Sequence, residues 1–317
     1  MNPKRLGLVS LAGLALSGSV VMTRLGLQEL PAFTLIALRL LVATAAFAIA
    51  IAVLRPPLPR GARTMGDVAL IGLISTALPL IAFTLALQYM SSGVLTLFIA
   101  LFPLVTGLMA HLMLAHEKLT AAKLGGLGVA FGGVLYLLLT GTSGLSSGRV
   151  VLDIRGPLLS LTGVVIGSFA TVYTRRQLTH VNVVSVSAGQ TVVAAAFVAP
   201  LALASAPLNL TTISGMGWLA IGYTGLIGSF LAFLLIFQLI RDYGATSSTV
   251  VTYLMPPLSG VLGAVILKEV ITLPLVIGAI LIFLGVFFAE RGAPPRPSPA
   301  AEPTPQDDLR RDPCLMC

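Results

Sequence analysis

The chain has 317 residues, of which 56% are hydrophobic and only 9% are charged. A soluble domain is about a quarter charged, so this composition excludes an ordinary soluble fold and predicts a protein embedded in a lipid bilayer. The formal net charge is +8, but the Lys and Arg residues lie in short gaps between apolar runs. That distribution argues against a nucleic-acid partner and is typical of membrane topology.

Apolar runs long enough to cross a bilayer, about 20 residues each, follow one another along the chain. The first five are predicted at 6–27, 33–54, 67–88, 92–115 and 121–140. The next five are predicted at 157–175, 182–204, 215–239, 245–267 and 271–289. We therefore expect an all-α integral membrane protein with ten transmembrane helices. The remaining segment, 291–317, is rich in Pro and charged residues and is predicted to be a disordered cytoplasmic tail.

Basic residues are distributed unequally between alternate loops. With ten spans, one side of the membrane receives Lys4, Arg5, Arg55, Arg60, Arg63, Lys118, Lys123, Arg175, Arg176, Arg241, Arg291 and Arg296. The other side receives Arg149, Arg155 and Lys268, with Arg24 near an outer helix end. Because short loops rich in Lys and Arg stay in the cytoplasm, both termini are predicted to be cytoplasmic.

The two halves of the chain share a sequence pattern. The matched pairs are Glu117 with Glu269, Thr120 with Thr272, Pro103 with Pro256, Gly126 with Gly278, and Gly13 with Gly163. Each five-helix unit, 1–141 and 156–290, contains an odd number of spans, so the second unit starts from the opposite side of the membrane. We therefore expect an inverted repeat, an architecture in which secondary transporters hold their substrate near the midplane between the repeats.

At these residues the chain resembles the drug/metabolite transporter superfamily, in the ten-helix group with two EamA domains. The resemblance rests on Pro103 followed by Glu117-x-Leu119-Thr120, and on Pro256 followed by Glu269-x-Ile271-Thr272, each with a Gly-rich helix after it. It covers about residues 6–289. It implies a multi-pass protein of the inner membrane that exports amino acids or related metabolites. Many members carry Trp-Gly in helix 1, where this chain has Ser17-Gly18, so the resemblance does not transfer a particular substrate.

Arg39 is the only charge well inside a predicted span. An unpaired guanidinium costs at least about 2.5 kcal/mol at such a depth, so it needs a counter-charge, carbonyl groups or water. Its repeat mate is the neutral Gln190, which shows that the fold does not require a charge there in both halves. This asymmetry fits a binding site for the carboxylate of an amino acid. The alternative is an Arg39 that reaches the outer interface or bonds helix ends together.

Further candidates for the substrate site are polar and aromatic residues of the predicted spans. Thr249, Thr252, Tyr253 and Pro256 recur at spacings of three and four, so they form one stripe on a helix. Such a stripe faces either a cavity or a neighbouring helix. The residues that we expect to complete the lining are Gln88, Tyr223, Phe230 and Phe233.

Three prolines lie within predicted spans and are candidate hinges. Pro103, Pro256 and Pro257 each remove a backbone hydrogen bond, and the freed carbonyls must find other partners. We expect kinks that line the cavity and flex during transport, with a permanent kink as the alternative. Gly128-x-x-x-Gly132 is predicted to permit close helix contact, within one protomer or in a homodimer, so both states remain open.

Glu117 and Glu269 follow predicted helices, where a negative charge opposes the helix dipole. We interpret each, together with the threonine three residues later, as the start of the next helix. Proton coupling through these carboxylates or through His111 is the alternative. His116-Glu117 lacks the second histidine of a zinc-protease motif, and we expect neither a metal site nor a cofactor.

The pattern thus predicts a secondary carrier that works by alternating access on a small-molecule substrate in the lipid bilayer. A membrane-embedded enzyme would need clustered ionisable residues, whereas Asp67, Asp153 and Asp242 lie in different loops on both sides. A membrane scaffold or a lipid-handling protein without solute transport is the remaining alternative.

The predicted topology is testable with reporter fusions. Fusions after Arg63, Lys123 and Arg176 and in the tail should report the cytoplasm, and fusions near Ser146 and Asn209 should report the outside. The physical reason is the retention of Lys- and Arg-rich loops on the cytoplasmic side. A C-terminal reporter on the outer side would contradict the ten-span arrangement.

Overall fold

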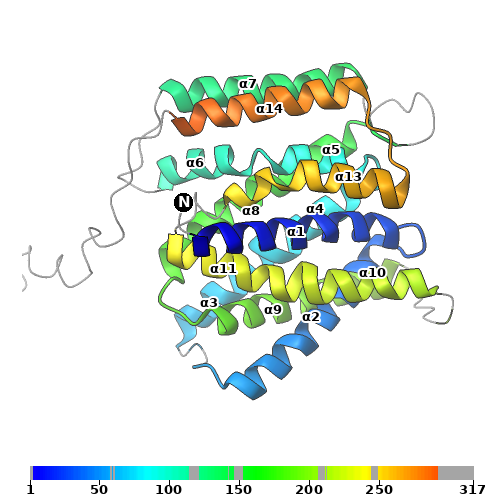
Figure 1. Cartoon of the computed structure of the whole chain (residues 1–317). Coiled ribbons are helices and arrows are strands. Elements are labelled where there is room, and N and C mark those ends of the chain that lie inside the picture. Colours follow the sequence, from blue (N-terminus) through cyan, green and yellow to red (C-terminus); the bar gives the residue numbers. More distant parts are fainter. Residues whose placement is uncertain are drawn as a thin grey trace, which may run out of the picture.

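The computed structural model describes residues 3–57, 59, 61–113, 121–141, 143–145, 153–205, 211, 213–243 and 249–291. Within these ranges all the regular elements are helical (Figure 1). In the described part of the chain, seven helical segments are long and apolar enough to cross a membrane, and three shorter apolar helices complete the series. The predicted all-α membrane fold with ten spans is confirmed. The predicted tail beyond 291 and the Glu117 motif lie outside the described residues.

The first half builds five spans from eight helical elements. They are α1 (Pro3–Gly26), α2 (Ala32–Leu54), α3 (Ala62–Ile71), η1 (Gly72–Ala77), α4 (Leu78–Ala86), α5 (Ser92–Ile99), α6 (Phe102–Met113) and α7 (Ala121–Leu139). The third span is therefore continuous from α3 to α4 through one π-helical segment, η1. The fourth span is divided between α5 and α6.

The second half repeats this order of elements. They are α8 (Arg155–Gln177), α9 (Val183–Ser205), α10 (Gly215–Gly225), η3 (Leu226–Leu231), α11 (Ala232–Tyr243), η4 (Thr249–Tyr253), α13 (Met255–Leu267) and α14 (Leu273–Arg291). The π-helical segment η3 interrupts the eighth span where η1 interrupts the third. The ninth span is divided like the fourth, with the 3-10 segment η4 preceding α13.

Contacts between the halves follow a two-fold pattern. Two elements pack against their own repeat mates, α2 on α9 and α7 on α14 (Figure 1). The parts of the divided fourth and ninth spans exchange partners, because α5 packs on α13 as η4 packs on α6. Other contacts occur in exchanged pairs, because α4 packs on α8 as α11 packs on α1, and η1 packs on α9 as η3 packs on α2. This exchange is what two inverted units related by an axis in the membrane plane produce.

Two glycines show how closely the halves correspond. A Cβ added to Gly72 would lie 2.7 Å from the Val193 Cβ and 2.9 Å from the Gln190 carbonyl oxygen. A Cβ added to Gly225 would lie 2.7 Å from the Val42 Cβ and 2.9 Å from the Arg39 carbonyl oxygen. The predicted pairing of Arg39 with Gln190 is therefore confirmed at the level of the backbone.

The prolines begin helical segments instead of interrupting continuous helices. Pro103 is the second residue of α6, after a turn at Ala100 and Leu101, and Pro256 is the second residue of α13. In the first turn of a helix a missing N–H removes no intrahelical hydrogen bond. The spans therefore divide just before these prolines, where the sequence pattern predicted kinks within one helix.

A carboxylate from the second half caps a helix of the first half. The Ser92 N–H and hydroxyl donate to Glu269 over 2.8 and 2.6 Å, which satisfies a free N–H at the start of α5. Thr272 accepts a hydrogen bond from the Leu275 N–H over 3.4 Å, so its predicted role at the start of α14 is confirmed. Glu269 itself caps the start of α5, on the other side of the interface between the two repeats.

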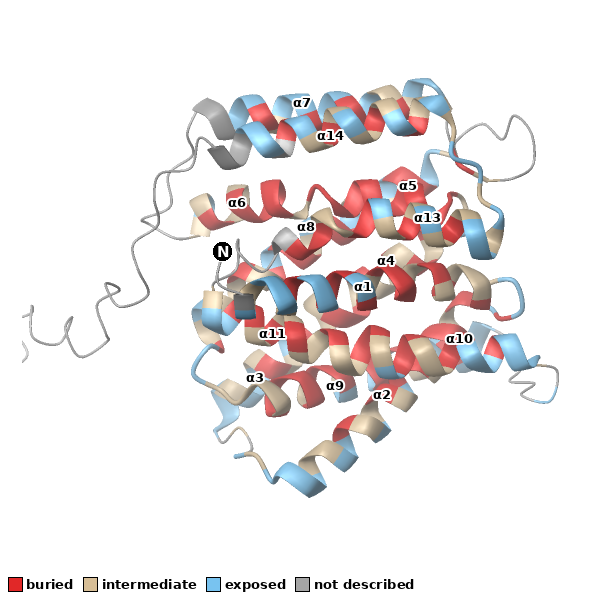
Figure 2. Cartoon of the chain, viewed as in Figure 1, coloured by how far each residue is buried: buried red, intermediate tan, exposed pale blue. Residues whose placement is uncertain are grey.

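Large apolar side chains remain exposed on the outside of the bundle. Val53, Leu139 and Val265 are each at least 74% exposed, and Figure 2 shows exposed residues along the outer helices α2 and α7. In a membrane these side chains face lipid tails, which are as apolar as leucine. Among the described residues, nothing lies within 4 Å of a Cβ added to Gly128 or Gly132, whereas α7 packs on α14 through Gly133, which lies close to Ile282. The prediction that Gly128 and Gly132 form the close helix contact within the protomer is therefore wrong, because the contact is made by Gly133.

The close approach at the π-helical segments yields a stability prediction. Gly72→Ala and Gly225→Ala should each destabilise the protein by about 1–3 kcal/mol, because overpacking a tight contact forces the backbones apart. Melting temperature in detergent is the measurement. Gly107→Ala is the control, since a Cβ there meets nothing within 4 Å. Equal melting temperatures for all three variants would contradict the tight packing.

Candidate functional site

A cavity of about 220 Å³ lies between the two halves. Residues of α1, α2, η1, α4, α5 and α6 line it from the first half, and residues of α8, α9, η3, α11, η4 and α13 line it from the second. Pockets for drug-sized ligands have volumes of about 300–1,000 Å³. A cavity of this size therefore suits a small metabolite.

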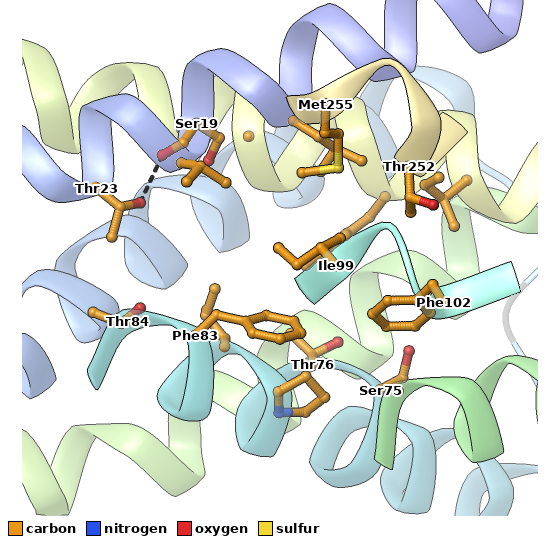
Figure 3. A pocket seen from close by; sticks show the side chains of 18 of the residues that line it. Ser19, Thr23, Ser75, Thr76, Phe83, Thr84, Ile99, Phe102, Thr252 and Met255 are labelled. Atoms are coloured by element: carbon orange, nitrogen blue, oxygen red, sulfur yellow. Dashed lines mark hydrogen bonds between the residues drawn. The ribbon is translucent and has the colours of Figure 1, made fainter. Parts of the chain in front are cut away.

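Most of the cavity wall is apolar. Phe83 and Phe102 lie with their ring centroids 6.4 Å apart, and Ile99 and Met255 extend the same surface. Figure 3 shows Phe83 and Ile99 between two groups of hydroxyls, with Ser19 and Thr23 on one side and Ser75 and Thr76 on the other. Because the polar groups are few, each of them strongly influences which ligands the cavity can bind.

Arg39 of α2 is the charged residue among those that line the cavity, and it is 4% exposed. Two acceptors belong to α1: the Arg39 Nη2 donates to the Ser19 Oγ over 3.1 Å, and Nη1 donates to the Thr23 Oγ1 over 3.2 Å. From η3, the Ser229 Oγ accepts from Nε and Nη2 over 3.2 and 3.1 Å, and the Gly228 carbonyl accepts over 3.5 Å. Three helical elements thus converge on one guanidinium.

The local sequence makes room for this arrangement. Ser19 and Thr23 are four residues apart on α1, so they lie on one face of the helix. A Cβ on Gly228 would fall 2.0 Å from the Ser19 Oγ and 3.3 Å from the Arg39 Nη2. Glycine at this position of η3 therefore lets α1 and the guanidinium approach the backbone.

In the described part of the chain, the hydrogen-bond partners of the guanidinium are all neutral. Its hydrogen-bond partners are three hydroxyls and one carbonyl, and no acidic side chain in the described ranges forms an ion pair with it. Hydrogen bonds to neutral acceptors satisfy the N–H groups but leave the net positive charge. A positive charge in a cavity with apolar walls attracts an anionic group strongly, because the local dielectric is low.

The equivalent positions of the other half also line the cavity. Gln190 is 1% exposed and Thr76 is 2% exposed. Within the described part of the chain, the Gln190 amide oxygen and the Thr76 hydroxyl have no hydrogen-bond partner. The sequence pattern indicates Gln190 only as the repeat mate of Arg39 and does not by itself indicate Thr76. The alignment of Gly72-Leu73-Ile74 with Gly225-Leu226-Ile227 is the signal that pairs Thr76 with Ser229.

The structure brings three of the predicted substrate-binding residues to the cavity, namely Arg39, Phe233 and Thr252. Four others do not line it. Gln88 is exposed after α4, Tyr223 lies beside Gly18, Phe230 packs on Phe47 with ring centroids 4.7 Å apart, and Tyr253 packs against the main apolar core. The side chain of Thr249 lies outside the described part.

The predicted hinge residues and His111 lie outside the cavity wall. Pro103 and Pro256 are buried beside the breaks in the fourth and ninth spans, and Pro257 is exposed. His111 is partly buried in the last turn of α6. In the described residues no group of three or more His, Cys, Asp or Glu is placed to hold a metal ion.

Comparisons with known proteins agree with this architecture. No curated protein sequence is significantly similar to the chain. A solved structure titled "Crystal structure of protein" has a TM-score of 0.65 and 24% sequence identity, and the match covers 90% of this chain and 97% of that one. A likeness at this identity shows the fold alone. The profile of the EamA-like transporter family matches residues 4–139 and again residues 154–290, so this chain belongs to the EamA-like transporter family.

Proposed function

We propose that this protein is a secondary carrier that exports small metabolites such as amino acids across the inner membrane, with both termini in the cytoplasm. Membership of a transporter family and a cavity formed by both inverted halves support a carrier. The single observation that carries the substrate class is Arg39, a guanidinium in the cavity wall whose described partners are all neutral.

In this proposal the carboxylate of the substrate supplies the missing negative charge. A guanidinium has five N–H donors, and the Arg39 donors already bond to Ser19, Thr23 and Ser229. The carboxylate binds on the cavity side of this cluster and forms a charge-assisted hydrogen bond, which is stronger than a neutral one. Thr252 and Phe233, which also line the cavity, contact the rest of the molecule.

Alternating access then consists of rocking one half against the other around the bound substrate. The divided spans α5–α6 and η4–α13 allow the segments on either side of the cavity to move separately, with Pro103 and Pro256 as proposed hinges. Glu269 and Ser92 hold α5 to the second half, and this contact must change if the two halves separate at that end. A proton that binds a carboxylate such as Glu269 is one way to drive that change.

The experiment is counterflow of radiolabelled amino acids in proteoliposomes with the purified protein. Arg39→Gln copies the repeat mate and should raise the apparent KM by about 10- to 100-fold, as expected for the loss of a hydrogen bond to a charged group. Arg39→Lys keeps the positive charge but loses the planar, bidentate donor geometry of the guanidinium. Its apparent KM should therefore lie between those of the wild type and Arg39→Gln.

Both variants must be compared at equal amounts of folded protein, judged by gel filtration. An Arg39→Gln protein that transports with an unchanged apparent KM would contradict the carboxylate role. Counterflow of no amino acid by the wild type would contradict the proposed substrate class and favour a scaffold or lipid-handling protein.

A further inference from the structure

We propose that Thr76 and Gln190 form a second polar subsite that binds the ammonium group of a zwitterionic amino acid. This inference rests on the proposed carrier function and assigns the end of the substrate that Arg39 does not hold. Both residues line the cavity, both are at least 98% buried, and each has an oxygen without a hydrogen-bond partner in the described ranges.

The inverted repeat explains why the Thr76 and Gln190 oxygens lie at these positions. Thr76 occupies the position of Ser229, and Gln190 occupies the position of Arg39, because Gly72 meets Gln190 as Gly225 meets Arg39. In one half the pair is joined, since Arg39 donates to Ser229. In the other half the Gln190 amide oxygen and the Thr76 hydroxyl both have no hydrogen-bond partner among the described residues.

The two pairs offer opposite chemistry to a ligand. Arg39 carries donors only, whereas an amide oxygen accepts and a threonine hydroxyl both accepts and donates. A buried polar atom without a partner is unfavourable, so the Thr76 and Gln190 oxygens favour a ligand, or a water in its absence, that donates hydrogen bonds. The ligand that satisfies both pairs has an acceptor end with negative charge and a donor end.

An α-amino acid has these two ends on one carbon, and its side chain then contacts the apolar wall. Phe83, Phe102 and Ile99 supply that wall (Figure 3). Leucine is therefore a suitable probe. Two compounds of nearly the same shape remove one end each: 4-methylpentanoate lacks the ammonium group, and 3-methylbutylamine lacks the carboxylate.

The test measures equilibrium binding of each radiolabelled compound to purified protein in detergent by scintillation proximity. The wild type should bind leucine at least about tenfold more tightly than 4-methylpentanoate. Thr76→Val with Gln190→Met removes both oxygens at nearly constant volume. This double variant should bind leucine about tenfold more weakly, or worse, with the affinity for 4-methylpentanoate changed by less than about twofold.

Thr106→Val is the matched control. Thr106 is also fully buried, and its hydroxyl has no hydrogen-bond partner in the part of the chain that the structure describes, but it does not line the cavity. This variant should keep the wild-type affinity for both compounds, which separates the loss of a buried hydroxyl from the loss of a ligand contact.

Two results would overturn the subsite. One is a wild type that binds leucine and 4-methylpentanoate equally, and the other is a double variant that weakens both compounds by the same factor, which indicates a structural role. Either result leaves the carboxylate site of Arg39 standing. A wild type that binds neither carboxylate overturns the proposed function together with this inference.

Discussion

A guanidinium at membrane depth keeps its charge, and the chain must supply hydrogen-bond acceptors for its five N–H donors. Arg39 meets this constraint with hydroxyls from α1 and with a hydroxyl and a carbonyl from η3. These contacts bind the first and second spans to the eighth. They also require glycine at 228, because a side chain there would collide with Ser19. The geometry of one wall of the cavity therefore depends on this residue.

The two repeats differ at Arg39, whose mate is Gln190, and this difference is informative about function. The two halves correspond closely in their backbones, with a glycine against a neighbouring carbonyl in each: Gly72 begins η1, and Gly225 directly precedes η3. Where the halves differ in a buried side chain, the fold does not require the difference. Arg39 with Ser229 and Gln190 with Thr76 occupy such positions, and both pairs line the cavity. We infer that this difference lets a symmetric carrier hold an asymmetric substrate with a positive and a negative end.

The spans and the repeat were predictable because lipid imposes long apolar segments and because glycine, proline and glutamate recur at matched positions. The lining of the cavity was less predictable. A membrane helix is apolar on the face toward lipid and on the face toward its neighbours, so periodicity could not show that Phe233 faces the cavity while Phe230 packs on Phe47. The π-helical segments were also invisible, since the extra residue in such a turn shifts the register without a sequence signal.

The central claim is that the carboxylate of the substrate lies against the Arg39 guanidinium. Solid-state NMR of the protein in lipid, with ¹⁵N-labelled arginine and leucine labelled with ¹³C at the carboxylate, measures this contact directly through the dipolar coupling. We predict a coupling that corresponds to a carbon–nitrogen distance of about 4 Å, present in the wild type and absent in Arg39→Gln. Bound leucine whose carboxylate shows no coupling to any guanidinium nitrogen would contradict the account.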